Sequence, residues 1–289
     1  MLSLPERGVE IALHDWGGDG PLALLHHANG FCAALFGLMV PPLLPHFHVI
    51  GMDARGHGDS SRPPQPSDYH WSHFVDDLLA VASRLVEELD HERVELAIGH
   101  SFGGTCTAIA ASRRPALYAH VAMLDPVIFP PEGWTPPAEF AGPRPDMAAV
   151  ARKRRAVWPS RDAVRDVWST PPHPFSGWDP RALELYVREG FRERPDGQVE
   201  LKCAPEVEAA VFDHNHSLSP FEFGAALSVP TLLLWAARGH FPRAIFERFT
   251  ELMPDARVED VDGGHLLPMQ APDLTAEAIL RFALRERSR

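Results

Sequence analysis

The stretch VELAIGHSFGG, residues 94–104, decides the fold. Residues 94–98 form a short apolar run typical of a buried strand, and residues 103–113 have one apolar side, which is typical of a helix. Between them, Gly-His-Ser-Phe-Gly fits the G-x-S-x-G pattern of a sharp strand-to-helix turn that exposes a serine. Such a turn leaves no space for side chains on either flank, and Gly99 and Gly103 carry none. We therefore expect Ser101 at the carboxyl end of a strand, above the first turn of a helix.

Composition places limits on the kind of protein. The chain has 289 residues, of which 45% are hydrophobic and 23% charged, enough for one large core with a long insertion. The net charge of -12 argues against a nucleic-acid partner. The 3 cysteines are few and scattered, which is typical of a reducing compartment. Charged residues within the first fifteen positions and the lack of a long apolar run predict neither a signal peptide nor a membrane span. We expect a cytoplasmic protein.

Strands and helices are expected to alternate over most of the chain. The alternation predicts a mainly parallel sheet with helices on both faces. Residues 127–224 differ, because they are rich in proline, hold four of the tryptophans and contain helical segments at 146–157, 181–191 and 205–212 with no strands between them. We expect a core of residues 1–126 and 225–289 and an inserted helical region of residues 127–224. Strands are expected at 9–13, 22–25, 47–52, 94–98, 120–124, 229–235 and 257–261, and core helices at 71–89, 103–113, 243–252 and 272–285.

Five motifs occur in the order found in one family. They are the turn ending Asn29-Gly30-Phe31, the run DARGHGDS at 53–60, GHSFGG at 99–104, PTLLLW at 230–235, and Gly263-Gly264-His265. With them the chain resembles α/β-hydrolase fold proteins, in the branch of capped serine hydrolases and esterases. The resemblance implies an α/β-hydrolase fold with a mainly parallel central sheet and a helical cap inserted after the family's sixth strand, here residues 120–124.

The resemblance also implies a nucleophile and a base. A serine hydroxyl is a weak nucleophile at neutral pH and needs an adjacent base, which an acid must orient. The chain order in this fold is serine, acid, histidine. Ser101 is the expected nucleophile. His265 is the expected base, because it follows the last expected strand and two glycines that let its loop bring the imidazole over the serine.

The acid departs from the family's usual position. Many relatives carry it after the seventh strand in a W-G-x-x-D pattern, whereas the matching stretch here is WAARG at 235–239, with Gly239 in the acid's place. Either Asp125, at the end of the sixth strand, is the acid, as in some members of the fold, or the site has no acid. We favour Asp125, whose alternative role is to cap the backbone where the insertion begins. Asp262 is a weaker candidate because its loop to His265 is short.

Two backbone N–H groups should form an oxyanion hole. One belongs to Phe102, at the positive end of a helix. The other comes from the turn at residues 27–30, where the family's His-Gly pair appears as a longer His-Ala-Asn-Gly, and Asn29 is the first choice. The apolar pocket for the substrate has low-weight candidates that could equally pack the cap onto the core: Phe31, Phe129, Trp134, His214 and His216.

Two other clusters are interpreted as structural. Asp53 and the turn at residues 55–60 look like a glycine-rich scaffold whose polar side chains bond to the backbone. Asp213-His214-Asn215-His216 has two histidines two positions apart and no third ligand nearby, so we predict no metal.

These residues predict a serine hydrolase that cleaves a small to medium carboxylic ester through an acyl-enzyme. The serine excludes members of the fold that use a carboxylate nucleophile, and no cofactor is implied. The same three residues would serve a thioester, a lactone, C–C cleavage, acyl transfer to another acceptor, or perhydrolysis. An alternative from another class is a small-molecule binding protein on the same fold without turnover, which the missing acid after the seventh strand would favour. The oligomeric state is left open.

Overall fold

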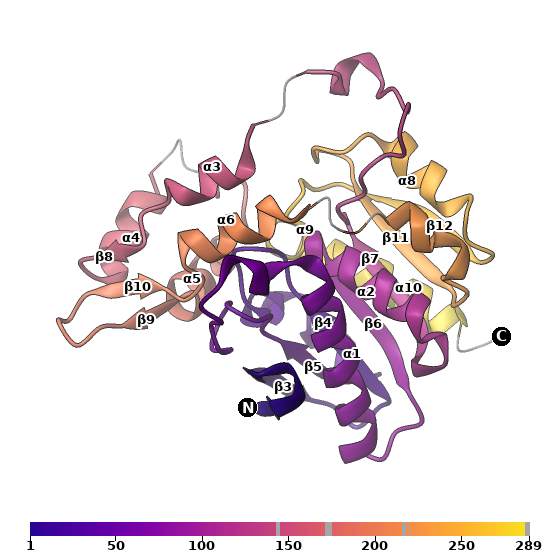
Figure 1. The fold of residues 1–289 in the computed structure, drawn as a ribbon, viewed down its shortest axis with the longest axis horizontal. Coiled ribbons are helices and arrows are strands. Elements are labelled where there is room, and N and C mark those ends of the chain that lie inside the picture. The colour runs from indigo at the N-terminus through magenta and orange to yellow at the C-terminus, as the bar shows by residue number, and fades with distance from the viewer. Residues whose placement is uncertain (143–144, 171–174, 216–217, 219, 287–289) are drawn as a thin grey trace.

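A computed structural model describes residues 1–142, 145–170, 175–215, 218 and 220–286. Its centre is a seven-stranded sheet in the order β12-β11-β7-β6-β4-β5-β3 (Figure 1). β3 pairs antiparallel with β5, and the other neighbours run parallel. The bounds are β3 (Leu13–Gly17), β4 (Leu22–His26), β5 (His48–Met52), β6 (Val94–His100), β7 (Tyr118–Leu124), β11 (Thr231–Ala236) and β12 (Ala256–Val261).

The strand order places a site at one edge of this sheet. From β4 the chain goes to β5 on one side and later returns to β6 on the other, so β4 and β6 flank a topological switch point. Loops that leave adjacent parallel strands in opposite directions open a crevice at the carboxyl ends of the strands. The turn after β4 and Ser101 after β6 both lie at this crevice.

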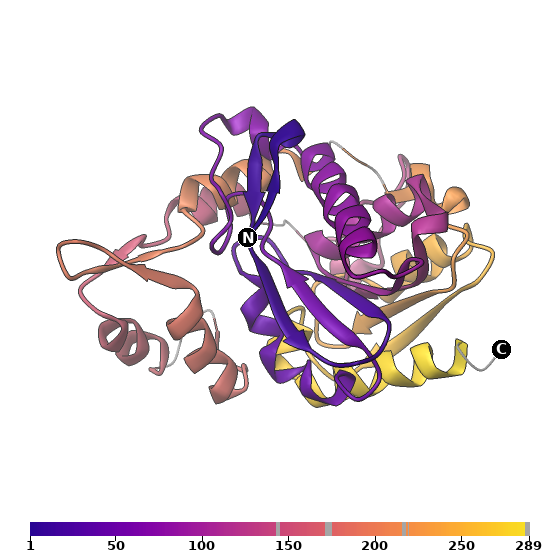
Figure 2. The ribbon, with the colours of Figure 1, turned by 90° about the horizontal axis from the view of Figure 1, so that it is seen from below.

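Both faces of the sheet are covered by helices. Leu24 and Ala97 belong to one apolar cluster with α1 (Trp71–Glu88), α2 (Phe102–Arg113) and α8 (Arg243–Thr250). Leu25 and Ile98, the next residue on each strand, belong to a second cluster with α10 (Pro272–Glu286). Figure 2 shows α1 and α10 on opposite sides of the strands. Burial on both faces explains why these strands read as continuous apolar runs, and it confirms the predicted fold class.

The expected core elements are present, with one difference near the start of the chain. Residues 9–13, predicted as one strand, divide into β2 (Val9–Ile11), which pairs with β1 (Leu2–Leu4), and β3. At the break, the Ala12 N–H donates to the Ser60 side chain at 2.9 Å instead of to a strand. The short helices of the core are η1 (Pro5–Arg7), η2 (Ala33–Leu38), η3 (Pro41–Leu43), η4 (Pro66–Tyr69), η5 (Pro115–Leu117) and α9 (Leu267–Gln270).

The segment between β7 and β11 contains strands as well as helices, so the expectation of no strands there was wrong. β8 (Val157–Trp158), β10 (Val199–Leu201) and β9 (Phe191–Glu193) form a small antiparallel sheet. Strands of two or three residues are too short to show a period of two. The helices are α3 (Met147–Arg152), α4 (Arg161–Trp168), α5 (Pro180–Glu189), α6 (Pro205–Asp213) and α7 (Pro220–Phe223), with η6 (Ala138–Phe140) and η8 (Gly224–Ala226).

An aromatic cluster holds this segment together. The rings of Trp168 and Tyr186 stack with centroids 5.4 Å apart, and Trp158 and Trp178 belong to the same buried group. The group also contains Leu35 from the core, so it joins the segment to η2. Figure 1 shows α4, α5 and the small sheet beside the central sheet. These three tryptophans therefore pack within the segment and against the core.

No helix in the described ranges has both the length and the apolar composition needed to cross a bilayer.

Candidate active site

The turn between β6 and α2 has the strained geometry that its sequence predicts. Ser101 has φ 55° and ψ -121°, a backbone conformation that residues other than glycine rarely adopt. A Cβ at Gly99 would lie 2.4 Å from the Gly103 carbonyl oxygen, and a Cβ at Gly103 would lie 2.4 Å from the His26 carbonyl oxygen. Only glycine fits at either position, which explains the G-x-S-x-G pattern. The packing holds the serine at the end of the strand.

The structure brings the predicted serine, histidine and aspartate into one chain of hydrogen bonds. The Ser101 hydroxyl lies 2.9 Å from Nε2 of His265, and Nδ1 of His265 lies 2.6 Å from a carboxylate oxygen of Asp125. The Asp125 side chain is fully buried, and the His265 side chain is 19% exposed. A carboxylate can only accept, so Nδ1 carries the proton and Nε2 is free to accept from the serine.

The Asp125 carboxylate is held by the neighbouring strand. Its backbone N–H donates to Leu234 at 2.8 Å, and its second carboxylate oxygen accepts the Ala236 N–H at 3.0 Å. A Cβ at Gly239 would lie 3.1 Å from the oxygen that faces His265. A side chain at position 239, where the family usually has its acid, would therefore crowd the Asp125 carboxylate. The Asp262 side chain is 75% exposed and pairs with Arg238.

His100 fixes the histidine loop, a contact that sequence reasoning missed. Its Nε2–H donates to the backbone carbonyl of His265 at 2.8 Å. Burial, helped by the nearby His265, lowers the pKa of His100 to about 3, so the ring stays neutral and gives its one proton to this bond. The Phe241 ring packs edge-on against His265, with centroids 5.5 Å apart. The variable position of G-x-S-x-G carries no signal that would have identified His100.

The two predicted oxyanion donors lie on elements that meet beside Ser101. Phe102 is the first residue of α2, where a backbone N–H has no acceptor within the helix. Asn29 lies in the turn after β4, the neighbour of β6. The Asn29 side chain is engaged in other hydrogen bonds. Its Nδ2 donates to the Glu208 carbonyl at 2.9 Å, and its Oδ1 lies 3.0 Å from Nε2 of His57. Its predicted role therefore rests on its backbone N–H.

Four of the five predicted pocket residues are found in packing contacts. The Phe31 ring lies 5.4 Å from the Tyr186 ring, and the His214 ring lies 5.5 Å from the His70 ring, centroid to centroid. Phe129 and Trp134 pack, partly buried, against the core. His216 lies outside the described residues. Their role as a pocket lining stays a prediction.

Asp53 forms the scaffold that the sequence predicts. Its carboxylate accepts the Ala33 N–H at 2.7 Å and the Asp59 N–H at 2.9 Å, and the Ser60 hydroxyl donates to its carbonyl at 2.6 Å. Its carboxylate also lies 3.2 Å from Nε2 of His14. These bonds close the turn at residues 54–60 onto β5. Within the part of the chain that the structure describes, histidine, cysteine, aspartate and glutamate side chains form no group of three placed to hold a metal.

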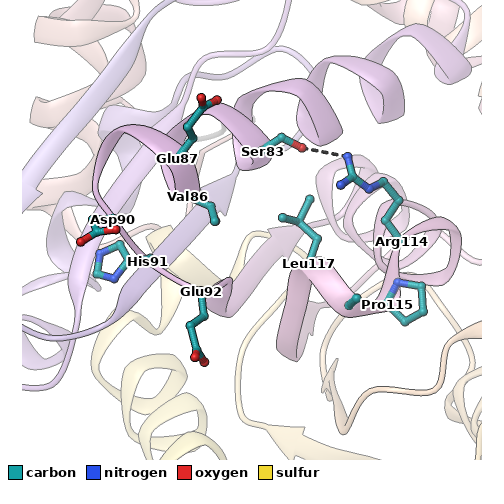
Figure 3. Close-up of a pocket in the computed structure, with 10 residues that line it drawn as sticks. Ser83, Val86, Glu87, Asp90, His91, Glu92, Arg114, Pro115 and Leu117 are labelled. Atoms are coloured by element: carbon teal, nitrogen blue, oxygen red, sulfur yellow. Dashed lines mark hydrogen bonds between the residues drawn. The ribbon is translucent and has the colours of Figure 1, made fainter.

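A surface pocket lies at the end of the sheet opposite to Ser101, and Figure 3 shows the residues that line it. Ser83, Glu87 and Arg114 line it where α1 ends and η5 begins, and Arg114 donates to the Ser83 hydroxyl at 3.0 Å. These elements adjoin the amino ends of β6 and β7, whereas Ser101 follows the carboxyl end of β6. A strand rises about 3.3 Å per residue, so the length of β6 separates this pocket from Ser101 by roughly 20 Å.

A sheet of this order with a serine elbow after β6 defines the α/β-hydrolase class of fold. The chain belongs to this family, because the family model described as alpha/beta hydrolase fold matches residues 21–272. The resemblance predicted from the motifs is thereby confirmed.

Individual relatives are more distant. The probable oxidoreductase EphD of Mycobacterium tuberculosis is 24% identical over 299 residues, which cover 96% of this chain and 48% of that protein. The type I acyl-CoA thioesterase mpaH of Penicillium brevicompactum is 31% identical over 144 residues, 49% of this chain and 30% of that protein. The chain thus spans about half the length, or less, of these curated relatives. The crystal structure of E-2-(acetamidomethylene)succinate hydrolase superposes with a TM-score of 0.75 at 21% identity, covering 96% of both chains.

Proposed function

We propose that the protein is a serine hydrolase that cleaves a small to medium carboxylic ester through an acyl-enzyme. The observation that carries the proposal is the hydrogen-bonded series from the Ser101 hydroxyl through His265 to the buried carboxylate of Asp125. This arrangement activates a serine for attack on a carbonyl carbon.

Each proposed residue has a defined part in the reaction. Ser101 Oγ attacks the ester carbonyl while Nε2 of His265 takes the hydroxyl proton, and Asp125 stabilises the resulting imidazolium. The backbone N–H groups of Phe102 and Asn29 stabilise the oxyanion. His265 then gives the proton to the departing alcohol, leaving an acyl-enzyme. A water molecule, deprotonated by His265, attacks the acyl carbon and releases the acid and the free serine.

The acyl group is proposed to lie between the core and residues 127–224, which would act as a cap. Phe31, Phe129 and Trp134 are proposed as apolar lining residues, together with His214 and His216. Similarity to an acyl-CoA thioesterase over half of this chain supports a thioester as the second substrate type. The same residues would also act on a lactone or a C–C bond, or transfer the acyl group to another acceptor.

A binding protein without turnover is the alternative from another class. Its main support was the absence of an acid after the seventh strand, and the contact between Asp125 and His265 removes that support because the imidazole has a carboxylate partner.

Fluorophosphonate labelling tests the proposal directly. The wild-type chain should be labelled and should hydrolyse p-nitrophenyl esters, with a preference that changes along a series of rising acyl length. Ser101→Ala should abolish both signals while its thermal unfolding stays close to that of the wild type. A well-folded wild-type chain that neither reacts nor turns over any ester, thioester or lactone would favour the binding protein instead.

A further inference from the structure

The turn after β4, residues 27–31, is held from outside the core. We propose that Glu208 of α6, with Arg154, is a positioning residue for this turn. The position of α6 against the core then determines where the second oxyanion donor lies. The inference rests on the proposed function, in which the Asn29 backbone N–H is that donor. Contacts at three places carry it: the Asn29 side chain, the space over Gly30 and the Gly30 carbonyl.

The first contact fixes Asn29 itself. Its side chain is anchored on two sides, since the amide nitrogen donates to the backbone carbonyl of Glu208 at 2.9 Å and the amide oxygen lies 3.0 Å from Nε2 of His57. Asn29 is 8% exposed and His57 is fully buried. One anchor belongs to the core and the other to α6, so moving α6 would move one side of the residue that carries the proposed donor.

The second contact lies directly over Gly30. Gly30 has φ 83°, and a Cβ there would lie 2.8 Å from both Cδ and Oε1 of Glu208. The Glu208 carboxylate therefore covers the turn where a side chain would otherwise be. Glycine satisfies both demands at once, because it accepts the positive φ and leaves space for the carboxylate.

The third contact, at the Gly30 carbonyl, completes a ring of three hydrogen bonds around the turn. The Glu208 carboxylate accepts a hydrogen bond from Arg154, and the other terminal nitrogen of Arg154 donates to the Tyr186 hydroxyl at 2.7 Å. The Tyr186 hydroxyl in turn donates to the Gly30 carbonyl at 3.5 Å. Residues from α6, from α5 and from the segment that follows α3 thus converge on the backbone of one turn of the core.

The ion pair is largely buried, which suits a positioning role better than a ligand-binding one. The Arg154 and Glu208 side chains are 20% and 12% exposed. Burial by itself would lower the pKa of Arg154, but the Tyr186 and Glu208 oxygens outweigh it and raise that pKa, so the guanidinium stays charged. Each charge is already neutralised by the other. Ala151 of α3 and Ala209 of α6 belong to one buried apolar cluster, which packs the two helices together beside the ion pair.

Two variants separate positioning from folding. Glu208→Ala removes the carboxylate over Gly30, and Asn29→Ala removes the side-chain anchors but keeps the proposed N–H donor. Glu206→Gln is the matched control, because Glu206 lies on the same helix, is exposed and changes the same charge. Thermal unfolding of each variant identifies any general loss of structure.

The first measurement is hydrogen–deuterium exchange, which needs no turnover. Glu208→Ala should speed exchange of the amides of residues 27–31 at least tenfold and leave those of β6 unchanged, whereas Glu206→Gln should change neither. Unchanged exchange at the turn in a folded Glu208→Ala protein would overturn the inference. Should the wild-type chain hydrolyse no ester at all, the proposed function fails, and this experiment still decides whether Glu208 positions the turn.

The second measurement compares p-nitrophenyl acetate with its thionoacetate. Sulfur accepts hydrogen bonds poorly, so hydrolysis of the thionoester depends little on oxyanion donors. Both variants should lower kcat for the oxygen ester by roughly 10- to 100-fold, with KM nearly unchanged, because a displaced donor loses part of the transition-state stabilisation that a removed donor would lose. The thionoester rate should fall less than threefold. Equal losses on both substrates would show a general effect on the site and would refute the positioning role.

Discussion

Asp125→Asn is the sharpest test of the proposed acid. Asp125 accepts two hydrogen bonds, one from Nδ1 of His265 at 2.6 Å and one from the Ala236 N–H at 3.0 Å. An amide has one oxygen and cannot accept both. If the oxygen stays on Ala236, the NH2 group faces Nδ1, the imidazole proton moves to Nε2, and His265 can no longer take the proton of Ser101.

The cost of the substitution follows from the alternative orientation. Turning the amide oxygen to His265 restores the reactive tautomer but leaves the buried Ala236 N–H without an acceptor, at about 1–3 kcal/mol. The neutral amide also stabilises the imidazolium less than a carboxylate does, by roughly 1–2 kcal/mol. The sum of about 2–5 kcal/mol lowers kcat by about 30- to 5,000-fold at about 1.36 kcal/mol per factor of ten.

The assay is steady-state hydrolysis of p-nitrophenyl acetate, with circular dichroism melting to confirm folding. Asp262→Asn is the matched control, because it makes the same change three residues from His265 on a side chain that is 75% exposed and pairs with Arg238. It should keep kcat within about twofold, as expected for an exposed ion pair. If Asp125→Asn retains the wild-type rate, or if the control loses as much activity, then the orienting acid is not Asp125.

Three further predictions address the surroundings of the site. Gly239→Ala should lower kcat at least tenfold with little loss of stability, because its Cβ would lie 3.1 Å from the carboxylate oxygen that faces His265; an unchanged kcat would mean that the carboxylate can shift freely. Trp168→Ala should lower the free energy of unfolding, measured in urea, by about 3–5 kcal/mol. The control Val167→Ala, at a neighbouring residue that is 52% exposed, should change it little. A loss under about 1 kcal/mol for Trp168→Ala would contradict the packing role. The free energy of unfolding should fall as the pH drops from about 6.5 to about 4. Burial lowers the pKa values of His26 and His57 to about 4, so the unfolded chain binds these protons at a higher pH than the folded chain does. Each histidine should then lower the free energy of unfolding by up to about 1.4 kcal/mol per pH unit. Equal stability in urea at pH 7 and pH 5 would contradict this last prediction.

The core of the fold was predictable because its signals are local. A strand buried on both faces appears in the sequence as an apolar run, and an amphipathic helix as apolar residues three or four apart. Gly99 and Gly103 are required because a Cβ at either position would lie 2.4 Å from a carbonyl oxygen, which is too close. The short strands β8, β9 and β10 were missed because pairs and triplets of residues have no measurable period. Their pairing depends on partners far along the chain.

The arrangement of the candidate site was predictable where a residue follows the carboxyl end of a strand, as Ser101, Asp125 and His265 do. It was not predictable where the role depends on contacts between distant segments. Glu208 reads in the sequence as one more acid on a helix, and its contacts with the turn at residues 27–31 join distant positions, since Asn29 and Glu208 are 179 residues apart. His100 is likewise invisible, because its partner is a backbone carbonyl.

The position of Asp125 follows from the pairing of two strands. β7 and β11 are parallel neighbours with Leu124 opposite Leu234, so the residues after both strands leave the sheet at the same edge. The Asp125 carboxylate lies 2.6 Å from Nδ1 of His265, and a Cβ at Gly239 would lie only 3.1 Å from the same carboxylate oxygen. With Asp125 after β7, a side chain at position 239 would therefore crowd the carboxylate, whereas glycine leaves it room. The glycine at position 239 and the proposed acid at position 125 are thus compatible with each other in the same small space.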